Sequence, residues 1–74
     1  KGNTLIGYDL PTAGDVTLTI FDVTGKVVFV KDQESVKGYN TISVSSKDIP
    51  SVGVLYYRLD ANEYSATKKM IIIE

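Results

Sequence analysis

The sequence has no cysteine and no histidine among its 74 residues. These absences remove the commonest nucleophile, the general base that titrates near neutral pH and the softer metal ligands. They also exclude a disulfide, so a fold this small must be held by packing alone. We therefore expect a domain that is not an enzyme and that takes no cofactor and no metal ion.

An excess of one charge and long apolar runs are missing as well. Eight Lys and Arg residues oppose nine Asp and Glu residues, which gives a formal net charge of −1. This balance provides no basic surface for a phosphate backbone, so nucleic acid is not an expected partner. No stretch approaches the roughly 20 apolar residues that span a bilayer, and residues 1–10 contain no apolar run typical of a signal peptide. We expect a soluble monomer without a transmembrane segment.

The remaining composition is that of one small globular domain. Hydrophobic residues make up 43% of the chain and charged residues 23%, which separates it from disordered linkers. A chain this short buries about 60% of the surface that its unfolded form exposes, so there is room for one thin core and no deep cleft. No repeat or composition shift divides the sequence, and we predict a single domain over residues 1–74.

Hydrophobic alternation with a period of two runs through the chain, and no helical period is sustained. The predicted strands are residues 4–10, 16–22, 26–31, 39–44, 54–61 and 64–73. The fold class that follows is all-β, a small immunoglobulin-like β-sandwich of six to seven short, mainly antiparallel strands. The predicted core consists of inward-facing residues of these strands: Leu18, Ile20, Val28, Ile42, Leu55, Tyr57 and Leu59.

The segments between the strands contain residue types that are typical of turns. Residues 11–15 include Pro11 and Gly14 and predict a turn, and Asp22 to Gly25 predicts a hairpin turn with positive φ at Gly25. The polar residues 32–37 predict a surface loop that ends at Gly38, and residues 45–52 could hold one helical turn. The nearly continuous apolar run in 26–31 predicts a strand that is central in its sheet.

The last seven residues are both basic and strongly apolar. They are Lys68, Lys69, Met70, Ile71, Ile72, Ile73 and Glu74. Residue chemistry alone favours an edge strand whose lysines discourage pairing with other sheets. The same exposed backbone can also be recognised by another protein through strand addition.

Other clusters have ordinary structural explanations. Tyr56, Tyr57 and Tyr64 could stack on a sugar, but strand alternation divides them between two faces. The aspartates do not form a calcium-loop array, and Asp60 with Glu63 lacks a cleft that could hold a glycoside between two carboxylates.

Two strings near the end of the chain resemble a known family. Residues 53–59 and 64–73, together with 6–11, 16–25 and the pair Gly38 and Tyr39, are similar in order and spacing to type A C-terminal sorting domains of the type IX (Por) secretion system of Bacteroidetes. The Asn-Pro-Phe segment usual before the position of Lys1 is missing, and the usual Leu-Pro-Ser-Gly has one residue inserted, reading 49–53 as Ile-Pro-Ser-Val-Gly. The first departure suggests a fragment of a larger secreted protein.

The resemblance implies a secretion signal that takes the form of a folded domain. Its parent would cross the periplasm, be recognised by the outer-membrane translocon and a shuttle β-barrel, and reach the cell surface or the medium, often after cleavage by a surface sortase-like peptidase. Residues 68–74 would be the recognition element. The residues that match the family's structural motifs are Pro11, Gly14, Asp22, Gly25, Gly38, Pro50, Gly53, Tyr57 and Leu59. The alternative is an accessory immunoglobulin-like, carbohydrate-binding or spacer module of a larger secreted enzyme.

Overall fold

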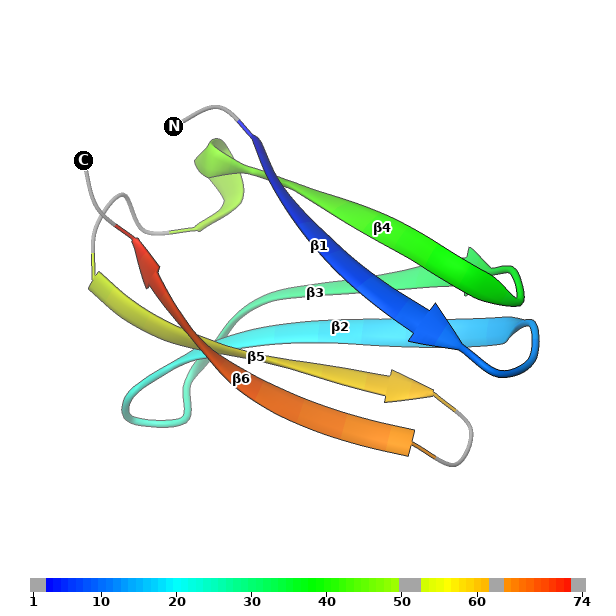
Figure 1. Ribbon diagram of the computed structural model, residues 1–74. Coiled ribbons are helices and arrows are strands. Elements are labelled where there is room, and N and C mark those ends of the chain that lie inside the picture. The colour runs from blue at the N-terminus through cyan, green and yellow to red at the C-terminus, as the bar shows by residue number, and fades with distance from the viewer. Residues whose placement is uncertain (1–2, 50–52, 62–63, 73–74) are drawn as a thin grey trace.

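A computed structural model of the chain describes residues 3–49, 53–61 and 64–72, and these residues are almost entirely strand (Figure 1). The elements of this part of the chain are β1 (Asn3–Leu10), β2 (Gly14–Asp22), β3 (Val27–Ser35), β4 (Gly38–Ser45), the 3-10 helix η1 (Ser46–Asp48), β5 (Gly53–Ala61) and β6 (Tyr64–Ile72). The all-β prediction is confirmed, and so is the helical turn after β4. No helix among the described residues has the length and apolar character needed to span a bilayer.

The strands form two antiparallel sheets that face each other as a sandwich. The smaller sheet pairs β1 with β4, and the larger has the order β3-β2-β5-β6. Side chains of β3 reach the free backbone of β4: Gln33 Nε2 donates to the Thr41 carbonyl oxygen at 2.9 Å, and Lys31 Nζ donates to that of Ser43 at 3.4 Å. The smaller sheet therefore lies with β4 above β3 (Figure 1).

The core lies between the sheets and is built from every second residue of four strands. Its buried members are Ile6, Val16, Leu18, Ile20, Ile42, Val44 and Leu55. Four of the seven residues predicted as core are buried, whereas Val28, Tyr57 and Leu59 are partly buried and pack against the cluster. The β-branched and aromatic composition of β2 suits this pleated, half-buried position.

β3 is longer than the sequence predicted. Residues 32–35 are not part of a surface loop but continue the strand to Ser35, so that only residues 36–37 connect it to β4. The inward positions of this half are polar yet satisfied, because Tyr8 Oη bonds Ser35 Oγ at 2.6 Å and accepts from Gln33 Nε2 at 3.1 Å. Partners on a distant strand thus make a polar segment a stable part of the sheet.

β3 is also an edge strand, so the predicted central position is wrong. Its apolar run does have two apolar faces, but only one of them is covered. Phe29 packs against the core, while Val27 and Val30 are 51% and 56% exposed on the opposite face. A continuous apolar run therefore did not require burial on both sides.

Two further predictions need correction at β2. Gly14 and Asp15 are not turn residues but the first two residues of the strand, paired with Ser35 and Glu34 of β3. The turn before β2 is shorter than predicted, at residues 11–13. Pro50, the turn at 62–63, and residues 73–74 lie outside the described residues.

Candidate functional site

The terminal strand β6 lies at one edge of the four-stranded sheet, paired on its other side with β5. The backbone register places Lys69 opposite Tyr56, Lys68 opposite Tyr57 and Met70 opposite Leu55. The edge position predicted from the terminal lysines is confirmed, because β6 has a strand neighbour on one side alone within the described part of the chain. Its other backbone edge is available for strand addition.

The two lysines occupy positions on opposite faces of the sheet. Residues directly opposite each other in an antiparallel pair share a face, and successive residues alternate. Position 68 therefore shares the face of Tyr57, which packs against the core, whereas position 69 shares the face of Tyr56. A partner that reads one face of the sheet would meet only one of these positions.

The family-motif residues Asp22 and Gly25 build the β2–β3 turn. The Asp22 carboxylate accepts hydrogen bonds from Thr24 N at 2.9 Å, Thr24 Oγ1 at 2.6 Å and Lys26 N at 3.0 Å. The Thr24 hydroxyl is the main cause that lowers the pKa of Asp22, although the carboxylate remains exposed to solvent. Gly25 has φ of 91°, as predicted, a conformation that side chains with Cβ adopt with strain.

The other described motif residues also have structural positions. Gly38 and Gly53 begin β4 and β5 with φ of 98° and 135°. Tyr57 and Leu59 lie on the inner face of β5, against the core. These residues shape strand ends and packing, and none of them forms a chemical site.

A set of exposed and partly exposed apolar residues that sequence reasoning did not single out lies on the other face of the four-stranded sheet. We call it the outer strip: Phe21, Val27, Val30, Val54 and Tyr56. Phe21 stacks on Tyr56 with ring centroids 5.7 Å apart and planes 20° apart. Phe21 is the register partner of both Val27 and Tyr56, so the strip crosses three strands. The sequence feature that indicates this strip is the second apolar face of β3, from which a central strand is predicted.

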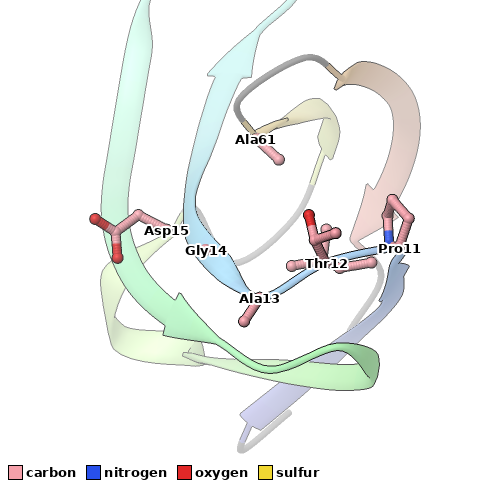
Figure 2. Close-up of a pocket in the computed structure, with 7 residues that line it drawn as sticks. Pro11, Thr12, Ala13, Gly14, Asp15 and Ala61 are labelled. Atoms are coloured by element: carbon pink, nitrogen blue, oxygen red, sulfur yellow. The ribbon is translucent and has the colours of Figure 1, made fainter.

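A hollow lined by the β1–β2 turn and by Ala61 of β5 is too small for a ligand. It measures about 20 Å³, room for roughly one water molecule. Figure 2 shows Pro11 and Thr12 on one side and Ala61 on the other, while the Asp15 carboxylate points away from it. Among the described residues, no group of three acidic side chains is placed to hold a metal ion.

The tyrosines of β5 do not form one sugar platform. Tyr56 stacks on Phe21 at the outer face, and Tyr57 packs toward the core on the inner face. Asp60 is paired with Arg58, whose Nε lies 2.8 Å from Oδ2. Hydrogen bonds from Ser65 and then Arg58 lower the pKa of Asp60, which keeps it ionised and unsuited to act as a general acid.

A family model described as "Secretion system C-terminal sorting domain" matches residues 1–73. No curated protein and no solved structure matches the chain.

Proposed function

Because the chain belongs to the family of secretion system C-terminal sorting domains, we propose that its terminal segment is the element that the type IX machinery reads. The domain is a C-terminal sorting signal for type IX secretion, and it directs export to the cell surface or the medium. Its family is not an enzyme family. The segment consists of Lys68, Lys69, Met70, Ile71, Ile72, Ile73 and Glu74.

The observation that supports this proposal is the edge position of β6. An edge strand offers a row of unpaired backbone donors and acceptors to a second strand. Lysines on such an edge suppress indiscriminate pairing, and a partner with matching acidic groups could still bind. The same segment can therefore protect the free domain from aggregation and serve as the recognition element for the translocon.

The route and the individual partners follow from the same reading. The parent would cross the inner membrane, fold its sorting domain in the periplasm and dock on the outer-membrane translocon and its shuttle β-barrel. A surface sortase-like peptidase would then act ahead of residue 1, releasing the cargo or joining it to an anionic lipopolysaccharide. Residues 1–74 would be the single C-terminal domain of a larger secreted protein, whose own activity lies in other domains.

The opposite-face positions of Lys68 and Lys69 give a sharper test than removal of the segment. Each lysine is replaced singly by alanine in a periplasmically targeted fluorescent protein fused ahead of the domain. The fusion is expressed in a bacterium that carries the type IX system, and the exported fraction is measured. The thermal midpoint of each purified variant is measured beside that of the parent, so that a loss of export is assigned to recognition only where folding is unchanged.

We expect Lys68→Ala or Lys69→Ala to lower export, with the larger effect identifying the face that the partner reads. Lys37→Ala is the matched control, because Lys37 is an exposed lysine in the β3–β4 connection. Wild-type export by both terminal variants would remove the lysines from the recognition element. A loss equal to that of Lys37→Ala would assign the effect to net charge alone.

A further inference from the structure

The outer strip is an apolar surface that the fold leaves uncovered. Val27, Val30 and Val54 are 51%, 56% and 39% exposed, and they flank the stacked rings of Phe21 and Tyr56. The solvent face of an antiparallel sheet is ordinarily polar. The core of the sandwich lies on the other side of the sheet, so these side chains add little to the burial that holds the two sheets together.

The same face becomes acidic toward its other end. Asp15 and Glu34 are directly opposite each other on β2 and β3. Asp32 precedes Glu34 by two residues on β3 and therefore lies on the same face. All three are exposed, and no cation among the described residues is paired with them. We call these three residues the acidic end. Like charges in directly opposite positions destabilise a strand pair, so this arrangement has a cost that the fold itself does not offset.

The two rows between Phe21 and Asp15 on β2 mix apolar and polar residues: Val30 lies opposite Thr19, and Asp32 lies opposite Thr17. Thr17 Oγ1 donates to Asp32 Oδ1 at 2.7 Å, and the Arg58 guanidinium is held by Asp60. The face thus changes from an apolar row at Phe21 to an acidic pair at Asp15 and Glu34. A surface graded in this way can orient a partner as well as bind it.

We propose that the outer strip and the acidic end together form a docking surface for a protein of the secretion machinery that presents apolar side chains beside Lys or Arg. This proposal rests on the sorting function and adds a second contact surface to that of the terminal segment. Charge complementarity selects the occupant. Lys or Arg side chains of the partner relieve the repulsion between Asp15 and Glu34, whereas an anionic lipid surface would be repelled by the same carboxylates.

The proposal predicts variants that lower export without lowering the stability of the domain. Glu34→Lys removes the like-charge pair, so the thermal midpoint of the purified domain should not fall and should rise slightly. Val30→Thr and Val27→Thr keep a β-branched side chain at exposed positions, so both should melt as the parent does. In the fluorescent fusion, each of the three should lower the export rate by about fivefold to tenfold, the loss typical of residues central to an interface.

Matched controls lie on the outer face of the smaller sheet. Leu5 is 67% exposed and Asp9 is also exposed, so Leu5→Thr and Asp9→Lys likewise place threonine at an exposed aliphatic position and lysine at an exposed carboxylate, away from the proposed surface. Both controls should be exported at the parental rate. Parental export by the outer-strip and Glu34 variants, or equal losses in the controls, would overturn the docking surface while leaving the sorting function intact.

Two further measurements separate other occupants from a secretion protein. Flotation of the purified domain with phosphatidylglycerol vesicles, abolished by Val30→Thr, would overturn the proposal in favour of a lipid surface. A concentration-dependent dimer in sedimentation, abolished by the same change, would overturn it in favour of a second copy. We expect neither. Failure of the intact fusion to leave the periplasm, in a host that exports its own cargo, would overturn the sorting function and this proposal together.

Discussion

The two faces of β2 contrast in residue type and in surroundings: the inner face is aliphatic, and the outer face is mostly polar up to Phe21. Leu18 and Ile20 on the inner face are fully buried, and they pack against the smaller sheet. Phe21, on the outer face, is partly exposed and stacks on Tyr56, while Thr19 on the same face is 6% exposed. The inner face holds the two sheets together, whereas the outer face carries the docking surface proposed above.

This difference shows how a small sandwich can present recognition features on its surface. A sandwich of this size has no interior in which to build a ligand site, so recognition must use its edges and its uncovered face. The terminal strand provides an edge, and the outer strip provides a face. Stability and export should therefore be separable by mutation.

The largest effect is expected at the inner face. Leu18→Ala should cost about 2 to 5 kcal/mol of unfolding free energy, because it leaves a cavity among fully buried neighbours. Val30→Ala on the outer face should change it by no more than about 0.5 kcal/mol. Urea denaturation of the purified domains measures both. A loss below roughly 1 kcal/mol for Leu18→Ala would show that the inner face has been wrongly assigned.

A smaller effect is expected at the turn that fixes which residues reach each face. The register between β2 and β3 shifts between Ile20 and Phe21, next to the turn that Gly25 closes. Gly25→Val introduces a β-branched side chain at φ of 91° and should destabilise the domain by about 1 kcal/mol or more. An unchanged denaturation midpoint would mean that the turn relaxes to ordinary φ values without loss.

The smallest effect concerns acid. The pKa of Asp22 lies below its ordinary value of 3.8, so the folded state binds fewer protons than the unfolded state near that pH. The stability contributed by this carboxylate is therefore complete above about pH 4 and is lost as pH falls through the folded pKa. Asp22→Asn keeps an acceptor oxygen and removes the titration. Its denaturation midpoint should fall less between pH 5 and pH 3 than that of the parent, and an equal fall would exclude Asp22 as a source of acid sensitivity.

The local sequence pattern predicted those features that depend on residues close together in the sequence. Alternation in β2 identified Leu18 and Ile20, and the sequence of the hairpin identified the positive φ of Gly25. These predictions succeed because the period of a strand and the freedom of glycine are properties of short segments. The β6 edge was likewise indicated by the lysines next to its apolar run.

The errors involve partners that are distant in sequence. Residues 32–35 are strand because Tyr8, more than 20 residues earlier, satisfies Gln33 and Ser35. Val27 and Val30 face solvent because none of the described strands covers the outer face, which their apolar character alone could not reveal. The recognition role of residues 68–74 remains a prediction, because it depends on a second protein.

The most direct test of the central claim is the location of a cargo. A periplasmically targeted fluorescent protein fused ahead of residues 1–74 is expressed in two strains of a bacterium that carries the type IX system, one intact and one lacking the outer-membrane translocon. Fluorescence at the cell surface and in the medium is measured as a fraction of the total. A sorting signal predicts export in the intact strain and retention in the periplasm of the other, and the same distribution in both strains would contradict it.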